Sequence, residues 1–384
     1  MSIVLFDGNA HKGLLPLTYT RSVSALRMGI FAMQERWERV TGEKIYVQTE
    51  KYLSVLYEPI PLGDNVFVDA AILPYKNFVE AVLSLKSGEM LCDEYGQVIA
   101  LRGNAVTKDA LQATIRASKS VSVRRIEHPW NIFQLNGEMM AFDFELVTSG
   151  RNTATVSPAN HLIKPGDIFI EEGAVIECSV LNASEGPIYI GKDAIVMEGC
   201  LIRGPFALGE KAVLKMGAKI YGASTIGPHC VAGGEIKNAI MHSYSNKAHD
   251  GYLGDSVIGA WCNLGAGTSN SNVKNNASAI KMQSQTNDSF LNAGLKCGVF
   301  MGDYSRTAIN TSINTGTSIG VSCNVFGAGL TPRSISSFSW GTSGETIYQF
   351  ERALSDIENW KKFKQQSLSN AEADVLKYIF DNFL

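Results

Sequence analysis

The sequence lacks the features that mark several large classes of protein. Its seven cysteines are scattered and odd in number, and none forms a C-x-x-C pair, so the sequence indicates neither a disulfide framework nor a zinc site. Basic and acidic residues nearly balance at a formal net charge of −3, which offers nucleic acid or an acidic membrane no basic surface. No apolar run approaches the ~20 residues that a membrane span needs.

The first residues and the setting of the cysteines both bear on where the protein works. The opening residues, MSIVLFDGNA, contain neither a positive segment nor a small-residue cleavage site, so we expect no secretory signal. Isolated cysteines among apolar residues are usually small buried hydrophobes rather than reactive groups. We therefore expect a cytoplasmic protein, and its 384 residues leave room for two domains.

Residues 1–155 alternate short apolar strands with amphipathic helices, which predicts an α/β domain. Strands are expected at 3–6, 44–48 and 66–70, and MLCDEYGQVIAL predicts a hairpin that turns at 93–96. The spacing of four apolar residues also predicts one helical face, made by Leu26, Ile30, Met33 and Trp37.

Residues 165–340 have a different pattern, because an aliphatic residue recurs every six positions beside small residues. One unbroken series is Ile190, Val196, Ile202, Leu208, Leu214, Ile220 and Ile226. Further runs pass through Ile258 and Leu264, and through Ile313, Ile319 and Val325. A six-residue period fits neither a helix nor a half-buried strand, and it is typical of a left-handed parallel β-helix built from hexapeptide repeats.

Helical periodicity returns over residues 341–384. Thr342 with Glu345, and Ser369 with Glu372, have the spacing of capping boxes, which predicts two terminal helices.

The stretch EIKNAIMHSYSNKAHDGYLGDSVIGAWCNLGAGTSNSN, residues 235–272, resembles the acetyltransferase half of the bifunctional glucosamine-1-phosphate acetyltransferase/N-acetylglucosamine-1-phosphate uridyltransferases. The shared elements are E-I-K, a histidine followed by Y-L-G-D, N-x-G-A-G-T and a later asparagine. The segment K-x-G-V-F-M-G-D, residues 296–303, also resembles archaeal-type sugar nucleotidyltransferases. The resemblance implies acetyl-CoA as donor and a homotrimer whose adjacent subunits share each active site.

Acetylation of a sugar amine needs a base, since an ammonium has no lone pair and histidine titrates near neutral pH. The resemblance places His249 in that role, with His242 as the second candidate, and places Asn272 near the reacting amine. Ala266 is implied as an acetyl-CoA contact, and Gly265 and Gly267 beside it would allow close approach of the pantetheine arm.

The resemblance also implies a pocket for the sugar phosphate. Glu235 and Asn263 are expected to contact the sugar, and Tyr252, Lys237 and Lys215 the phosphate. Lys215 stands where the family has arginine, which keeps the charge and loses the bidentate fork. Val273 replaces the usual tyrosine after the asparagine, and either Lys274 or Lys281 would stand for a later family lysine.

The N-terminal domain resembles sugar nucleotidyltransferases through IVLFDG and PLTYTRSVSALRMGI, and HPWNIFQLN accompanies this short, atypical form. The G-x-G-T-R motif and the downstream Pro-Lys are missing. Asp7 at the end of the first strand and Arg21 are implied in nucleotide binding, with Arg27 or Lys12 as further cations for the triphosphate. Mg²⁺ is expected with UTP or another NTP, although its ligands are not identifiable.

Three functions therefore remain open. The first is acetyl-CoA-dependent N-acetylation of glucosamine 1-phosphate followed by UTP-dependent formation of UDP-N-acetylglucosamine. The second is a nucleotidyltransferase whose β-helix is only a trimer scaffold. The third is a non-catalytic regulator that binds a sugar nucleotide.

Overall fold

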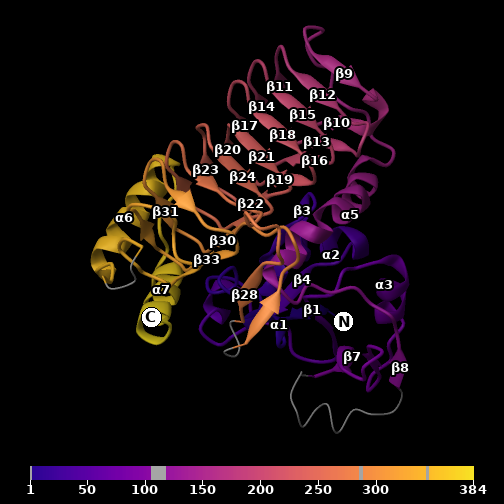
Figure 1. Ribbon diagram of the computed structural model, residues 1–384. Helices are drawn as coiled ribbons and strands as arrows, with labels where there is room; N and C mark the ends of the chain where they lie inside the picture. Colours follow the sequence, from indigo (N-terminus) through magenta and orange to yellow (C-terminus); the bar gives the residue numbers. More distant parts are fainter. Residues whose placement is uncertain (1, 105–117, 285–288, 343–345) are drawn as a thin grey trace. The chain divides into compact units, whose positions relative to one another are not determined.

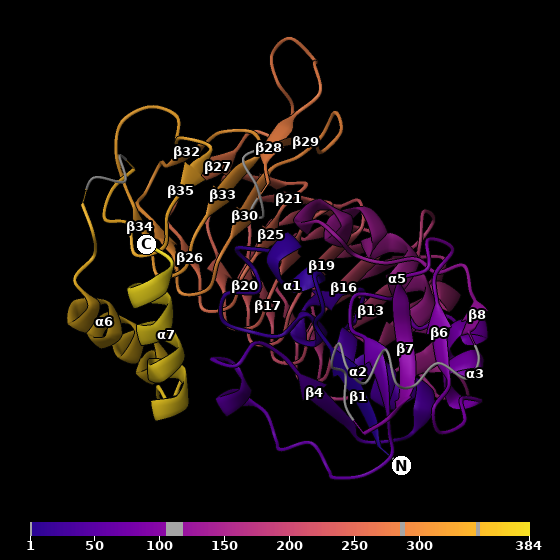
Figure 2. The same ribbon diagram turned by 90° about the horizontal axis from the view of Figure 1, so that it is seen from below.

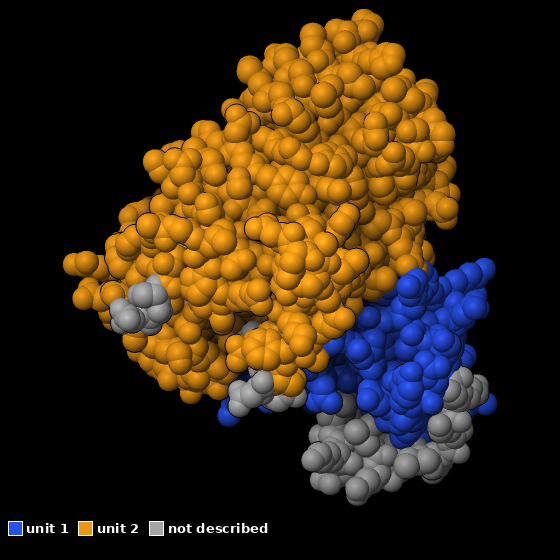
Figure 3. All heavy atoms as spheres, viewed as in Figure 1, with its two compact units in different colours: residues 1–14, 21–26, 31–128 blue, residues 15–20, 27–30, 129–384 orange. Residues whose placement is uncertain are grey.

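The computed structural model describes residues 2–104, 118–284, 289–342 and 346–384. The chain forms two compact units, which Figure 3 colours separately. Unit 1 comprises residues 1–14, 21–26 and 31–128, and unit 2 comprises residues 15–20, 27–30 and 129–384. We describe each unit by itself.

Unit 1 is built on a mixed sheet of six strands in the order β4-β1-β5-β7-β6-β8. The strands are β1 (Ile3–Phe6), β4 (Ile45–Gln48), β5 (Asn65–Asp69), β6 (Met90–Cys92), β7 (Val98–Gly103) and β8 (Ser118–Ser120). Its helices are α1 (Ala10–Gly13), α2 (Met33–Thr41) and α3 (Lys76–Leu83). Strands β1, β4 and β5 run parallel, so their carboxyl ends meet at one edge of the sheet. The expected hairpin is β6–β7, with a turn closed by Gly96 N–H donating to the Asp93 carbonyl.

The predicted helical face from Leu26 to Trp37 is wrong in its first half. Only Met33 and Trp37 lie on α2, because residues 27–28 and 31–32 are the short strands β2 (Arg27–Met28) and β3 (Phe31–Ala32). Gly29 between them has φ +68°, a left-handed conformation that glycine adopts at little cost. The apolar spacing alone predicted a helix, whereas the turn at Gly29 places the residues on either side of it in two short strands.

Unit 2 is a parallel β-solenoid, which confirms the predicted fold class (Figure 1). Each coil contributes one strand to each of three sheets, which we call the first, second and third solenoid sheets. The first contains β10 (Ile168–Ile170), β13 (Ile188–Ile190), β16 (Phe206–Leu208), β19 (Ser224–Ile226), β22 (Ile240–Met241), β25 (Val257–Ile258), β30 (Val299–Met301), β33 (Thr317–Ile319) and β35 (Ser334–Ile335).

The second sheet contains β11 (Val175–Ile176), β14 (Ile195–Val196), β17 (Val213–Leu214), β20 (Val231–Ala232), β23 (Asn246–Lys247), β26 (Asn263–Leu264), β31 (Arg306–Thr307) and β34 (Asn324–Val325). The third contains β9 (His161–Ile163), β12 (Val180–Asn182), β15 (Leu201–Arg203), β18 (Lys219–Tyr221), β21 (Glu235–Lys237) and β24 (Tyr252–Gly254). Beyond β24, the strands β27 (Ser269–Asn270) and β32 (Ser312–Ile313) pair with each other, and Asn270 joins them to β24 by accepting from Gly254 N–H. Between β27 and β32 the chain makes the antiparallel hairpin β28 (Lys281–Gln283) and β29 (Phe290–Asn292).

The six-residue series lines the interior of the solenoid. Ile190, Val196 and Ile202 are almost fully buried and lie on the first, second and third sheets in turn. Leu208, Leu214 and the rest of the series repeat this order. Full burial of one such side chain stabilises the fold by roughly 1.5–3 kcal/mol, so the stacked repeats form one continuous core.

The long helix α5 (Pro129–Thr148) packs on the outer surface of the first solenoid sheet. The amide of Asn136 accepts from Gly29 N–H and donates to the Ala223 carbonyl, at 2.7 Å in both cases. The rings of Phe133 and Phe300 stack with centroids 6.2 Å apart. This cover explains why outward residues such as Phe300 are buried.

Two helices, α6 (Phe350–Phe363) and α7 (Asn370–Asn382), follow the solenoid (Figure 2). The Ser369–Glu372 capping box is present at the start of α7. Glu345, the partner expected for Thr342, lies outside the described residues, and α6 begins only at Phe350. Glu372 also accepts from Lys361 and from the Tyr304 hydroxyl, which ties both helices to the solenoid.

Six of the seven cysteines are buried in the core, as predicted, and all are free thiols. Cys178 is the exception, because it stands exposed at a solenoid corner with φ +48°. Within the described ranges, no helix combines the length and the apolar character needed to cross a bilayer.

Candidate functional sites

The outer surface of the third solenoid sheet brings together four of the predicted site residues. On β21, Ile236 points into the core, so Glu235 and Lys237 point outward. Glu235 is in register with Tyr252 on β24. Asn272, which follows β27, bonds to Tyr252. We call Glu235, Lys237, Tyr252 and Asn272 the third-sheet cluster.

Tyr221, which the sequence analysis did not single out, joins this cluster from β18. Its hydroxyl donates to Glu235 Oε1 at 2.5 Å, and Lys237 Nζ lies 5.4 Å from the centre of its ring. The bond to Glu235, together with burial, raises the pKa of Tyr221 to about 12. Lys237 forms no ion pair within the described part of the chain, so its charge is available to an anionic ligand.

The amide of Asn272 is held by two oxygen atoms. Its Nδ2 donates to Tyr252 Oη at 3.1 Å and to Asp255 Oδ2 at 2.5 Å. The other carboxylate oxygen of Asp255 accepts from Asn238 Nδ2 at 2.7 Å. Since both Nδ2 hydrogens are engaged, the group that Asn272 offers to a ligand is the acceptor Oδ1.

Asp255 is therefore a site residue that the sequence analysis missed. It is buried and has φ +46°, an uncommon conformation for a non-glycine residue. It is the last residue of the Y-L-G-D motif that supports the family resemblance, but the resemblance assigned no role to this aspartate. Burial, followed by the charge of Asp255, raises the pKa of Tyr252, which keeps its phenol protonated.

Gly254 lets the ring of Tyr252 lie flat along β24. A Cβ atom at position 254 would stand only 2.2 Å from Tyr252 Oη and 2.5 Å from Cζ. Any larger residue would therefore push the ring away from Asn272.

His249 and Ala266 occupy equivalent places in successive coils, at the corner between the second and third sheets. The link between these coils is the bond from Gly267 N–H to the Asp250 carbonyl, at 3.0 Å. His249 is exposed, whereas His242 is only 3% exposed, which argues against His242 as a base for a dissolved substrate.

Lys215 and Asn263 lie elsewhere. Lys215 is at the same corner but on an earlier coil, after β17. Asn263 is on β26 in the second sheet, where its Oδ1 accepts from Asn246 Nδ2 at 2.7 Å. One chain therefore distributes the predicted residues over two faces and the corner between them, and it does not gather all of them into a single pocket.

In unit 1, Asp7 is the centre of a buried hydrogen-bond network at the carboxyl edge of the parallel strands. Its Oδ1 accepts from Ser22 Oγ at 2.5 Å and Val23 N–H at 2.9 Å. Its Oδ2 accepts from Thr49 Oγ1 at 2.5 Å and lies 3.0 Å from His11 Nδ1. This network holds the loop that follows Arg21 against the end of β1.

Two more buried carboxylates belong to the same unit. Asp69 ends β5 and bonds to Arg125 at 3.0 Å, and Asp93 lies 3.5 Å from the same guanidinium. Burial raises the pKa of Asp69 to about 6, and the charges of Asp7 and Asp93 add to this rise. The strand at residues 66–70 was predicted, but Asp69 at its end was not identified as a site residue.

These carboxylates do not form a Mg²⁺ site as they stand. Both oxygens of Asp7 already have two partners each, and Asp69 accepts from Ala71 N–H and from Arg125. Nowhere in the described ranges do three or more acidic, histidine or cysteine side chains gather as metal ligands. The binding of Mg²⁺ therefore remains a prediction.

The two predicted arginines fall in different units. Arg21 is partly buried in unit 1, directly before Ser22. Arg27 belongs to unit 2, where it is buried and its guanidinium donates to the Ile30 carbonyl. Lys12, the other candidate cation, is exposed at the end of α1.

Comparison with known proteins gives one match for the N-terminal part of the chain and different matches for a larger part of it. Residues 3–152 match the model of a family described as sugar nucleotidyl transferase. This range holds the six-stranded sheet and α5. Comparison with curated proteins gives no match.

Solved structures of UDP-N-acetylglucosamine acyltransferases align with about three fifths of the chain. The Arabidopsis enzyme is 15% identical, with 59% of this chain and 96% of that one covered and a TM-score of 0.28. The Campylobacter jejuni enzyme is 14% identical, with 60% and 97% covered and a TM-score of 0.27. The Francisella novicida enzyme is 16% identical, with 60% and 90% covered and a TM-score of 0.20. At these scores the likeness carries no part of the functional argument.

Proposed function

We propose that the solenoid transfers the acetyl group of acetyl-CoA to the amine of glucosamine 1-phosphate. The N-terminal domain would then join the product to UTP and form UDP-N-acetylglucosamine with release of pyrophosphate. The observation that carries the acetyl-transfer step is the pair of bonds from Asn272 Nδ2 to Asp255 and Tyr252, which leaves Oδ1 as the group that can accept from a substrate amine. The family match of residues 3–152 supports the nucleotidyl-transfer step.

In the proposed reaction, an imidazole nitrogen of His249 takes a proton from the substrate amine. The amine nitrogen forms a bond to the thioester carbonyl carbon, the C–S bond breaks, and the proton held by His249 passes to the sulfur, so that coenzyme A leaves as a thiol. Asn272 Oδ1 accepts a hydrogen bond from the amine and so aims its lone pair. Lys237 supplies positive charge for the sugar phosphate, and Glu235 accepts from sugar hydroxyls.

A homotrimer is part of this proposal, because one chain leaves Asn263 on a different face from Tyr252. The second solenoid sheet carries an outward apolar column suited to contact with a second copy. Val175 and Ile195 are 51% and 37% exposed there, and they are in register with each other and with Val213. Light scattering coupled to size exclusion checks this, and a monomer at assay concentration would contradict it.

The test of the chemistry is His249→Ala, with thiol release from acetyl-CoA measured in the presence of glucosamine 1-phosphate. Loss of a general base is expected to lower kcat by about 100-fold or more. The matched control is His161→Ala, which removes an exposed histidine from β9 on the third solenoid sheet and should leave the rate unchanged. Unchanged thiol release by His249→Ala would remove this residue from the mechanism.

The second candidate is a sugar-1-phosphate nucleotidyltransferase whose solenoid is only a scaffold. The dispersal of Asn263 and Lys215 away from the third-sheet cluster favours this reading. It predicts pyrophosphate release from UTP or another NTP with no dependence on acetyl-CoA. Binding of sugar nucleotides without either product would instead favour a regulator.

A further inference from the structure

Two adjoining cavities lie at the end of the solenoid, between its last coils and the excursion that carries the β28–β29 hairpin. The first has a volume of about 350 Å³ and the second about 260 Å³, and Arg333 lines both. Lys274 lines the first and Lys281 the second. We call them together the Arg333 cavities.

The segment of sequence that builds the cavities is positively charged in a chain that is negative as a whole. From Ser256 to Thr342 the sequence has five lysines and arginines and only two aspartates, against a net charge of −3 for the entire chain. One of the two, Asp303, is buried and accepts from Ala260 N–H at 2.7 Å and Thr20 Oγ1 at 2.6 Å. Among the residues that the structure describes, none that lines the cavities carries a carboxylate.

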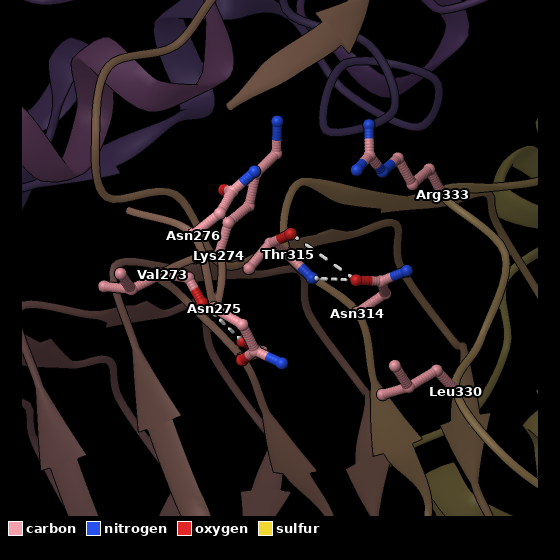
Figure 4. Close-up of a pocket in the computed structure, with 9 residues that line it drawn as sticks. Val273, Lys274, Asn275, Asn276, Asn314, Thr315, Leu330 and Arg333 are labelled. Carbon is pink, nitrogen blue, oxygen red and sulfur yellow. Dashed lines mark hydrogen bonds between the residues drawn. The ribbon is translucent and has the colours of Figure 1, made fainter. Parts of the chain in front are cut away.

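The polar groups of the first cavity are placed to donate hydrogen bonds. Figure 4 shows the charged ends of Lys274 and Arg333 extending to the same side from opposite walls, with the amide of Asn276 beside Lys274. Lys274 Nζ donates to the Ala279 carbonyl at 2.7 Å, which uses one of its three hydrogens. Asn314 Oδ1 accepts from Thr315 N–H at 2.8 Å, so its Nδ2 remains as a donor.

The Arg333 guanidinium has neither an ion pair nor a side-chain hydrogen bond within the described part of the chain. Two cations that face one space without a carboxylate repel each other, and the attraction of both cations to an anion between them outweighs that repulsion. A guanidinium binds two oxygens of a phosphate at once, and a lysine adds a point charge. The neighbouring amides can donate to the remaining oxygens.

We propose that the Arg333 cavities bind the phosphate groups of a small phosphorylated ligand, with Arg333 as the shared contact and Lys274 and Lys281 on either side. The size of the two cavities suits a diphosphate or a phosphate ester better than a single small anion. No member of the third-sheet cluster is among the described residues that line the cavities, although Ser271 and Val273, the neighbours of Asn272, line the first one. The proposal does not depend on acetyl transfer.

The test is hydrogen–deuterium exchange of the full chain with and without pyrophosphate, read by mass spectrometry. Peptides covering 271–284 and 328–335 are expected to exchange more slowly with pyrophosphate, and Arg333→Met should abolish this protection. This local readout separates the cavities from any pyrophosphate bound by the N-terminal domain. The matched control is Lys296→Met, which removes the same charge from an exposed residue that lines neither cavity and should keep the protection.

Glucosamine 1-phosphate, coenzyme A and UTP, each in place of pyrophosphate, identify which compound supplies the phosphate. Protection of the two peptides by any of the four compounds, lost in Arg333→Met and kept in Lys296→Met, supports the site. Absence of protection with all four, or equal loss in both variants, overturns it. Since no step of the experiment measures turnover, failure of the acetyl-transfer proposal would not affect its outcome.

Discussion

Lys247 gives the sharpest quantitative prediction, because it places an ammonium group inside the solenoid. The side chain is 2% exposed and stands in the inward position of β23, opposite Ala232. Its Nζ donates to the Gly233 carbonyl at 3.0 Å and the His249 carbonyl at 2.6 Å. Burial lowers the pKa of Lys247 from 10.5 to about 8, although the charge of Asp250 opposes this shift.

The sign of the pH dependence follows from proton counting. Between pH 8 and pH 10.5 the unfolded chain still holds this proton while the folded chain has lost it, so the free energy of unfolding rises with pH. With these two pKa values the contribution grows by about 2 kcal/mol between pH 7 and pH 9.5. Below pH 7 it is flat, because both states are protonated.

The assay compares the wild type with Lys247→Met by chemical denaturation at pH 7 and pH 9.5. The comparison is needed because buried thiols act in the opposite direction. Burial raises the pKa of Cys230 to about 12 and of Cys323 to about 11, so the folded state retains protons that the unfolded state loses. This effect is common to both proteins and cancels in the difference.

We expect the wild type to gain about 2 kcal/mol on Lys247→Met as pH rises from 7 to 9.5. The control Lys219→Met removes an exposed lysine from β18 and should follow the wild type. Parallel curves for the wild type and Lys247→Met would refute the reasoning, since they would show that Lys247 has the same pKa folded and unfolded.

Two further predictions concern the candidate sites. Gly254→Ala places a Cβ 2.2 Å from Tyr252 Oη, so the ring must move and acetyl transfer should fall about tenfold or more, while far-UV circular dichroism stays unchanged. Gly166→Ala, whose Cβ would meet no atom within 4 Å, is its control, and full activity of Gly254→Ala would separate Tyr252 from the reaction. Asp7→Ala removes the acceptor of a buried network and should destabilise the N-terminal domain by about 3 kcal/mol in denaturant titrations. A loss of nucleotidyl transfer at unchanged stability would show instead that Asp7 acts on substrate.

The third-sheet cluster shows which residues of a candidate site can be found from a local sequence pattern and which cannot. The resemblance identified Glu235, Lys237 and Tyr252, and in the structure the inward residues Ile236 and Leu253 beside them make them face outward on β21 and β24. Tyr221 and Asp255 were missed because their roles depend on contacts across coils, about 14 to 17 residues away in sequence. The positions of Asn263 and Lys215 away from this cluster could not be predicted either. A sequence motif gives the order of residues along the chain, but it does not say on which face of the solenoid each side chain lies.

The sequence by itself determined the solenoid. Each six-residue repeat contains its own inward aliphatic residue, and this residue stands at the same position in successive repeats. Only the tertiary structure showed where the spacing between inward residues departs from six. The corner between β20 and β21 has two residues, 233–234, where the corner between β17 and β18 has four, 215–218. This shortening and a five-residue step from Ile236 to Met241 together place Lys247 in the inward position of β23. The gathering of Arg333, Lys274 and Lys281 around shared cavities likewise depends on how distant coils stack.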